Sequence, residues 1–387
     1  MEIPSENFMH PEDSMSDLIF EPENTIRPEA VVERKKQLGV ARRKLKDHEL
    51  CWACGWTNLH QMSSSYNPRL KIVTTRENMG IWALGSKYLL KDFPNDGSSP
   101  GNDYVTHRFL QSQPNSGVPL LKEMQLLSKP TDKTYLLLMS RSESKSLSSI
   151  WPDVTIKQRL DLRKQMLKIL QDLRKFTASG AQTVDGGKLS DYILGGCSVT
   201  RPMCKTIGFD TEEWFANIEE ELRVGLEKIH ETKDPIIIER EYQKLKSNFP
   251  KSEPYTLTHG DLTLGNIMVD ENIQITEIID WEHAGYYPWW AEWWFSRMQA
   301  QDGSRPLLKP VFPLLEHSMN LATFDTEVLD PVGKVIQAWQ KCDIAHPHYL
   351  DRWLRPPFSA SEPYDGEFVL GHMGGITKRE HVIKRSP

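Results

Sequence analysis

The stretch THGDLTLGNIMVDENIQITEIIDWEHAG, residues 258–285, contains two short apolar runs separated by a polar break. The runs IMVD and ITEIID have the composition of β-strands, and the intervening ENIQ has that of a turn. The simplest arrangement is an antiparallel hairpin, in which the start of one strand lies opposite the end of the other. Asn266 opens the first strand and Asp280 closes the second. We therefore predict that the hairpin brings an amide oxygen and a carboxylate together at one end.

Asp261 lies in the loop before this hairpin, where it can lean over the same spot. A carboxylate and a carboxamide are oxygen ligands that suit Mg²⁺, which keeps water and substrate phosphate in its other positions. An Asp that does not bind the metal can accept a proton from a substrate hydroxyl. Asp261 and Asn266 have the spacing found in the catalytic loop of kinases. The pattern predicts phosphoryl transfer to an alcohol, with Asp261 as the catalytic base and with Asn266 and Asp280 as metal ligands.

Two longer segments, HGDLTLGNIMV and IIDWEHAGYYPWW, resemble the signature motifs of the aminoglycoside phosphotransferase and choline-kinase-like family. The chain is most similar to the fungal branch of that family, over about residues 79–300. The resemblance implies an α+β, two-lobed, protein-kinase-like fold, with a small antiparallel-sheet N-lobe and a larger, mainly helical C-lobe. It also implies ATP or GTP as the phosphoryl donor, Mg²⁺ as the metal ion, and a hydroxylated small molecule as the acceptor.

Upstream, GIWALGSKYLLK resembles the nucleotide-covering hairpin of the family, which ends in a strand lysine. The resemblance implies that Lys91 holds the α- and β-phosphates; taken alone, this residue reads as a surface lysine at a strand end. A helix acid, usually Glu, pairs with this lysine in the family, and alignment places Asp103 there. Its side chain is one methylene shorter than that of Glu. Asn102 competes for the position under a small register shift.

The segment YLLLMSRSESKSL, residues 135–147, resembles the hinge that connects the two lobes. The family often has Met-Glu-Arg at the positions that are Met139, Ser140 and Arg141 here, and a Gly where this chain has Ser144. Hinge recognition of adenine uses mostly backbone groups, so these departures are compatible with nucleotide binding. They leave the choice between ATP and GTP open.

Two further residues belong to the catalytic loop and its surroundings. In the family, the residue equivalent to His259 braces the catalytic loop; proton transfer and metal ligation are the alternatives. Glu282 follows Asp280 by two residues; we expect it to support the loop, with a contact to the metal ligands as the alternative. The tryptophans of this region pack between the hairpin and a following helix, or else form a stacking wall for a substrate; they are Trp281, Trp289, Trp290, Trp293 and Trp294.

The chain has 387 residues, enough for two lobes. We predict a weakly ordered tail over 1–30, a basic helix within an N-terminal unit over 31–138, a hinge over 139–147, a helical lobe over 148–345 and a C-terminal extension over 346–387. The net charge of −6 gives no support for binding to nucleic acid. No apolar run is long enough to span a membrane, and five cysteines do not make a disulfide framework. We expect a cytoplasmic protein.

Several motif matches are rejected on context. GIWALGSK has its Ser and Lys in the wrong order for a phosphate-binding loop, GSSPG around Ser99 has no strand before it, and CWAC lacks a second cysteine pair for zinc. Three functions remain. The first is a Mg²⁺-dependent small-molecule kinase, and the second is a catalytically weak pseudokinase that binds nucleotides or partners. The third is a metal-dependent hydrolase using His259, Asp261, Asp280 and His283, which does not explain the strand lysine or the Asp-to-Asn spacing.

Overall fold

The computed structural model describes residues 49–51, 56–57, 70–76, 79–95, 101–114, 116–194, 206–298, 305–315 and 321–342. The predicted tail over 1–30 and the C-terminal extension over 346–387 lie outside these residues. So does the predicted basic helix over 31–49, apart from its last residue, which begins strand β1 (Glu49–Cys51), paired with β2 (Trp56–Thr57). None of the described helices is long and apolar enough to cross a bilayer.

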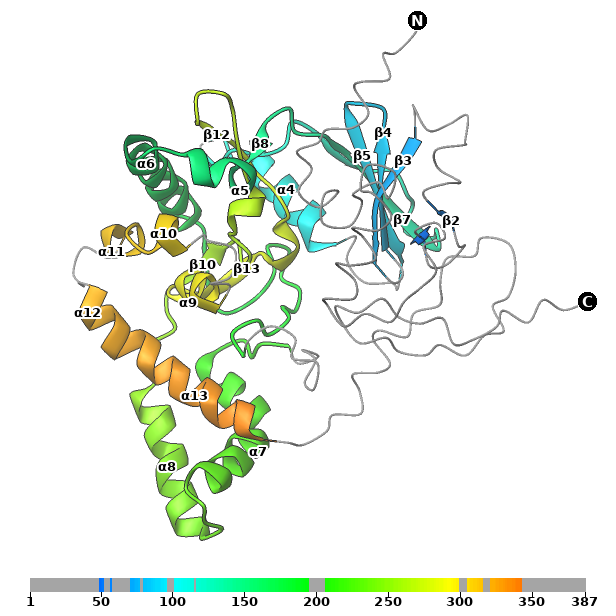
Figure 1. Cartoon of the computed structure of the whole chain (residues 1–387). Coiled ribbons are helices and arrows are strands. Elements are labelled where there is room, and N and C mark those ends of the chain that lie inside the picture. Colours follow the sequence, from blue (N-terminus) through cyan, green and yellow to red (C-terminus); the bar gives the residue numbers. More distant parts are fainter. Residues whose placement is uncertain are drawn as a thin grey trace, which may run out of the picture.

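The sheet lobe is built on five antiparallel strands in the order β3-β4-β5-β7-β6 (Figure 1). These strands are β3 (Leu70–Arg76), β4 (Met79–Leu84), β5 (Tyr88–Pro94), β6 (Met124–Leu126) and β7 (Thr134–Ser140). Strand β7 alternates buried and partly exposed residues, as expected for a strand with one face on a core. Its inward residues Leu137 and Met139 join Leu121 and Met124 in a small apolar cluster.

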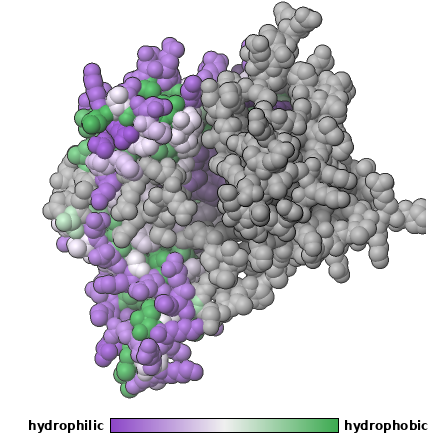
Figure 2. Space-filling view, in the orientation of Figure 1, coloured by the Kyte–Doolittle hydropathy of each residue, from purple (hydrophilic) through white to green (hydrophobic). Residues whose placement is uncertain are grey.

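The helical lobe follows in sequence and contains the larger apolar core. Its helices are α5 (Leu147–Ile150), α6 (Ile156–Leu173), α7 (Thr211–Ile229), α8 (Pro235–Asn248), α9 (Ala291–Met298), α10 (Arg305–Leu308), α11 (Phe312–Leu315), α12 (Leu321–Phe324) and α13 (Asp330–Lys341). Helices α7, α8 and α13 pack together at the end of the lobe away from the sheet (Figure 1). The exposed surface of this end is largely hydrophilic (Figure 2). The predicted α+β class, with an antiparallel-sheet lobe followed by a mainly helical lobe, is confirmed.

Helix α6 shows how local sequence sets an element of this lobe. Thr155 accepts a hydrogen bond from the Gln158 backbone N–H, and the Gln158 side chain accepts one from the Thr155 backbone N–H. This capping box satisfies two amide groups that a helix start leaves unpaired. The buried face carries apolar residues at helical spacing, such as Leu162, Met166 and Leu173. The recurrence of apolar residues at helical spacing after Ile156 is typical of a helix, and the structure has one at this place.

Two three-stranded sheets in the helical lobe contain the strands of the segment 258–285 with which the sequence analysis begins. One has the order β13-β10-β9, from β9 (Thr177–Ala178), β10 (Tyr255–Thr258) and β13 (Gly285–Pro288). The other has the order β12-β11-β8, from β8 (Lys145–Ser146), β11 (Ile267–Val269) and β12 (Ile275–Ile278). The chain thus leaves the five-stranded sheet at Ser140 and enters a sheet of the helical lobe at Lys145, so residues 141–144 bridge the lobes.

The hairpin predicted over residues 80–93 is present as β4 and β5, but it is not placed as the resemblance implied. Lys91 pairs with Ile81, several residues from the turn that joins these strands. That turn lies against the bridge between the lobes, because the Arg141 N–H donates to the Lys87 carbonyl oxygen at 2.7 Å. The turn nearer to Lys91 is the one between β3 and β4, whose residues 77–78 lie outside the described part of the chain.

Candidate functional site

The hairpin formed by β11 and β12 brings Asn266 and Asp280 together, as the sequence predicts. Ile267 pairs with Ile278, and the Ile279 N–H donates to the Asn266 carbonyl oxygen at 3.0 Å. Ile267 and Ile278 are buried in the core of the helical lobe. The packing of one face of the hairpin therefore fixes the position of its polar end.

The backbone at Asp280 differs from the predicted strand. Strand β12 ends at Ile278, and Asp280 has φ 66° and ψ 59°, a left-handed conformation that is uncommon outside glycine, Asn and Asp. A short 3₁₀ turn, η4 (Trp281–His283), follows. Because the strand ends, strand alternation does not set the direction of Glu282; its carboxylate lies toward the sheet lobe, as its contact with Lys91 shows.

Asp261 and Asn266 are in direct contact. The Asn266 side-chain N–H₂ donates to the Asp261 carbonyl oxygen at 2.8 Å and to its carboxylate at 3.1 Å. Asn266 lies in a second 3₁₀ turn, η3 (Leu264–Asn266), so the chain folds back on itself within five residues. Gly260 makes the tight entry to this loop possible: its φ is 84°, and a Cβ there would lie 2.6 Å from the His283 carbonyl oxygen.

The Lys91 side chain extends from β5 toward the polar end of the hairpin. Its Nζ lies 3.2 Å from a Glu282 carboxylate oxygen and 3.9 Å from one of Asp103. Burial disfavours the charged ammonium, but the carboxylates of Asp103, Glu282 and Asp280 outweigh this effect and raise the pKa of Lys91. Lys91 is therefore a buried cation at the contact between the lobes. Of the two direct ion-pair partners, Glu282 is closer than the predicted Asp103.

Helix α4 (Asn102–Ser112) holds the η4 turn through its first two residues. Asp103 accepts a hydrogen bond from the Trp281 backbone N–H at 3.0 Å while also facing Lys91. The Asn102 side chain donates to the carbonyl oxygens of Glu282, at 3.1 Å, and Ala284. Asn102 thus binds the turn, while Asp103 is the one of the two that lies beside Lys91.

His259 is fully buried beneath the loop, and both ring nitrogens have partners within the protein. Nε2 lies 2.9 Å from the Ile279 carbonyl oxygen, and Nδ1 accepts a hydrogen bond from the Asp261 backbone N–H at 3.2 Å. Burial lowers the pKa of His259 to about 4, so the imidazole is neutral at physiological pH. This geometry is that of a residue that supports the loop. Because both ring nitrogens have partners, neither is available to bind the metal that the hydrolase hypothesis requires.

Glu292 in α9 is a second support that sequence reasoning missed. One carboxylate oxygen accepts the His259 backbone N–H at 2.6 Å and the Gly260 N–H at 3.4 Å. Burial raises the pKa of Glu292 to about 7, against the opposing effect of these two hydrogen bonds. A carboxyl group at the start of a Trp-rich helix was a detectable signal, because charged residues are rarely buried without a specific partner.

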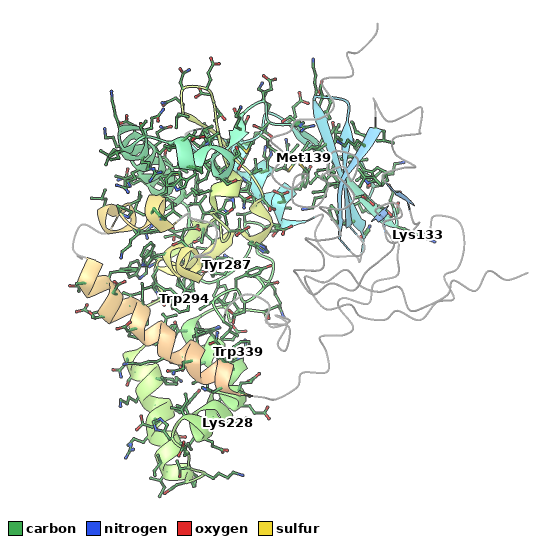
Figure 3. The ribbon with its side chains drawn as sticks, viewed as in Figure 1. Lys133, Met139, Lys228, Tyr287, Trp294 and Trp339 are labelled. Atoms are coloured by element: carbon green, nitrogen blue, oxygen red, sulfur yellow. The ribbon has the colours of Figure 1, made fainter. Side chains whose placement is uncertain are left out.

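Of the predicted hinge residues, Met139 and Ser140 end strand β7, and Arg141 begins the bridge between the lobes. The Ser140 N–H donates to the Glu123 carbonyl oxygen at 2.9 Å, and the Arg141 N–H donates to Lys87. Met139 packs inward from β7, on the side of the sheet toward the helical lobe (Figure 3). The backbone N–H groups of Ser140 and Arg141 already have protein acceptors in this structure.

The tryptophans of the region are packing residues. Trp281, Trp290, Trp293 and Trp294 are buried in the main core, and Trp289 packs against it. Tyr287 and Trp294 lie in the middle of the helical lobe (Figure 3). Such burial leaves these rings little surface for a substrate, so the structure favours the packing interpretation over the stacking wall.

The donor set at the polar end fits a hydrated cation. Asp280 is surrounded by acidic groups. Burial, together with the nearby carboxylates of Glu282 and Asp103, raises the pKa of Asp280 to about 7, although the ammonium group of Lys91 acts to lower it. Asn266 turns its amide nitrogen to Asp261, and in the described part of the chain its amide oxygen accepts no hydrogen bond. No three His, Cys, Asp or Glu side chains among the described residues are arranged to bind a metal by themselves. One carboxylate and one amide oxygen are the two protein ligands that suit Mg²⁺ carried with phosphates.

Replacing Lys91 with methionine should destabilise the protein by about 3 kcal/mol, because three carboxylates lose their shared buried cation. Denaturant titration of the wild type and of Lys91→Met measures the difference. Lys87→Met is the matched control, since this lysine is exposed in the turn at the start of the same strand and should change the free energy of unfolding little. Equal losses in the two variants would contradict the assignment of Lys91 as a buried ion-pair residue.

The free energy of unfolding of the Glu292→Gln variant should differ from that of the wild type by an amount that depends on pH. The folded wild type holds a proton on Glu292 up to about pH 7, whereas a free carboxyl releases it near 4.5. Protons therefore stabilise the folded wild type in this window, and the variant, which cannot titrate there, lacks the effect. As pH falls from 7 to 4.5, the wild type should gain about 3 kcal/mol relative to the variant. Denaturant titrations across this range measure it; a constant difference between the two proteins is the contrary result.

The model of the phosphotransferase enzyme family matches residues 133–308, a little under half of the chain. The matched stretch includes the bridge between the lobes, Asp261, Asn266 and Asp280, and it ends before α11. It does not include Lys91 or Asp103. Among curated proteins, none is similar enough in sequence to count as a match.

Solved structures of aminoglycoside phosphotransferases are similar to this chain at low identity. The ternary complex of APH(2")-IIa with streptomycin and ATP has 12% identity and a TM-score of 0.45, over 73% of this chain and 91% of that one. A mutant aminoglycoside 2'-phosphotransferase-IIIa in its GDP complex has 15% identity and a TM-score of 0.42, over 74% and 89%. The aminoglycoside-3'-phosphotransferase of type VIII has 15% identity and a TM-score of 0.39, over 71% and 94%.

Proposed function

We propose that this protein is a small-molecule kinase that transfers the γ-phosphate of ATP or GTP to a hydroxyl group of a metabolite. The observation that carries the proposal is the convergence of Lys91, Asp261, Asn266 and Asp280 from two lobes on one polar end of a hairpin. The family match over residues 133–308 supports it. The proposed division keeps the sequence boundaries, with nucleotide binding in 31–138, a hinge over 139–147 and catalysis in 148–345.

The residues take the following roles in the proposal. Asn266 and Asp280 hold Mg²⁺, which when bound neutralises charge on the nucleotide phosphates. Lys91 fixes the phosphates from the sheet lobe, while Asp103 and Glu282 keep its side chain in position. The nucleotide base lies against the hinge segment at Met139, Ser140 and Arg141.

Asp261 orients the acceptor hydroxyl and takes its proton. Its carboxylate receives a hydrogen bond from Asn266, which holds it beside the metal ligands. The transition state of phosphoryl transfer is loose and places little demand on base strength, so a carboxylate of ordinary basicity is sufficient. His259 and Glu292 act on the loop rather than on substrate, since their contacts are with backbone groups.

The test is a screen of Mg²⁺-dependent nucleotide consumption with ATP and with GTP against amino-alcohols, sugars and a small-molecule extract of the host. At least one acceptor should raise nucleotide consumption above the background rate, and the Asp261→Asn variant should abolish that increase. If none does so and Asp261→Asn leaves nucleotide turnover unchanged, the pseudokinase alternative replaces the proposal.

A further inference from the structure

Glu277 in β12 is a buried carboxylate that the proposed mechanism does not use. Only 7% of the residue is exposed. One carboxylate oxygen, Oε2, accepts hydrogen bonds from the Ser142 hydroxyl at 2.5 Å and the Thr276 hydroxyl at 3.2 Å. Within the described ranges, no cation forms an ion pair with it, and its Oε1 accepts no hydrogen bond. A buried carboxylate is costly without strong donors, so Oε1 is an acceptor that a ligand can satisfy.

The hairpin turns Glu277 toward the sheet lobe. Glu277 pairs with Met268, and the neighbouring pair, Ile267 with Ile278, is buried in the core of the helical lobe. Side chains alternate between the two faces of a strand, so Glu277 lies on the face away from that core. Ile279, two residues further on, packs against the apolar cluster of the sheet lobe. Glu277 therefore belongs to the floor beneath the sheet lobe, at the position where Ser142 crosses between the lobes.

The position of Glu277 between the bridge and the metal end matches that of the sugar in a nucleotide, which lies between the base and the phosphates. Glu277 contacts Ser142 of the bridge and precedes Asp280 by three residues. In the sheet lobe, Tyr88 pairs with Ser140 beside the bridge and precedes Lys91 by three residues. A nucleotide with its outer phosphates between Lys91 and Asp280 thus extends its sugar toward Ser142 and Glu277.

We propose that Glu277 binds the ribose hydroxyls of the phosphoryl donor; this inference rests on the proposed function. An ionised carboxylate accepts but does not donate hydrogen bonds, and a ribose presents two adjacent hydroxyl donors whichever purine it carries. Carboxylates serve this purpose in other nucleotide sites. Ser142 orients the carboxylate by holding Oε2, which leaves Oε1 for the sugar. Glu277 thereby selects ribonucleotides over deoxyribonucleotides.

The experiment measures binding of ATP, 2'-deoxyATP and 3'-deoxyATP, each with Mg²⁺, to the full chain by calorimetry. The wild type should bind ATP about tenfold more tightly than either deoxy form, as expected for a hydrogen bond to a charged group. Glu277→Ala should bind all three with the weaker affinity. Glu277→Gln, which keeps the side-chain shape and one acceptor oxygen, should retain part of the preference. Glu271→Gln, on the exposed turn of the same hairpin, should behave as wild type.

The outcomes are distinguishable. If the wild type binds ATP and both deoxy forms equally, the ribose assignment is wrong while the proposed function stands. If Glu277→Ala and Glu277→Gln, both with wild-type melting behaviour, keep the full preference, another residue reads the sugar and the assignment is again wrong. If the wild type binds no nucleotide, the proposed function itself fails. Should Glu277→Ala not fold, a full preference in Glu277→Gln together with Ser142→Ala overturns the inference.

Discussion

Asp280→Asn should lower the rate of phosphoryl transfer by about a thousandfold or more. The substitution keeps the shape of the side chain and tolerates the left-handed backbone at this position. It removes the one carboxylate that the proposal gives to the metal. The measurement is turnover with a saturating acceptor over a range of Mg²⁺ concentrations. The variant should also require more Mg²⁺ for half-maximal nucleotide binding.

The matched control is Glu271→Gln, which removes a carboxylate from the exposed turn of the same hairpin. It changes the net charge by the same amount, so it tests whether the loss comes from the site or from the charge of the region. Near-wild-type turnover in Asp280→Asn would show that Asp280 does not bind the catalytic metal. Equal losses in the two variants would point to a general effect of charge.

Asp261→Asn should lower the rate of turnover by about a hundredfold to ten thousandfold, the range expected for loss of a general base. Its effect on nucleotide binding should be small, since the proposal assigns Asp261 to the acceptor hydroxyl and not to the metal or the nucleotide phosphates. The asparagine side chain can still accept the hydrogen bond from Asn266 through its oxygen. Single-turnover measurements with bound nucleotide isolate the chemical step from binding.

The contrast between the two variants is the informative result. Asp280→Asn should impair both Mg²⁺-dependent binding and turnover, whereas Asp261→Asn should impair turnover alone. If Asp261→Asn weakened nucleotide binding as strongly as Asp280→Asn does, Asp261 would be acting on the metal or the phosphates. The assignment of Asp261 as the base would then be wrong.

The parts of the site that lie close together in the sequence were predictable. Strand length and hairpin register are local properties, and they bring Asn266 and Asp280 together without knowledge of the rest of the fold. Asp261 follows from its short loop, which can fold back only onto the hairpin. The order of a strand-rich part before a helix-rich part was also predictable from the sequence, whereas the two-lobed layout was implied by the family resemblance.

The parts that depend on contacts between distant residues were not predictable from a pattern. Lys91 and Glu282 are far apart in the chain, and their contact depends on the strand ending at Ile278 rather than continuing. Glu292 supports the loop only because α9 lies beneath it. The β4–β5 turn was misplaced for a different reason: the family resemblance assigned it to the nucleotide, whereas the local pairing of Lys91 with Ile81 puts this turn several residues away from the lysine.

The contacts of α4 with the η4 turn mean that Asp280, the proposed metal ligand, is not held in place by the helical lobe alone. Asn102 and Asp103 fasten the residues directly after Asp280 to a helix whose other contacts include strand β6 of the sheet lobe. Any rotation of one lobe relative to the other therefore also moves the Asp280 carboxylate. A substitution in the first turn of α4 lies far from the proposed acceptor. It should nevertheless change the position of the Asp280 carboxylate as directly as a substitution in the loop that carries Asp261.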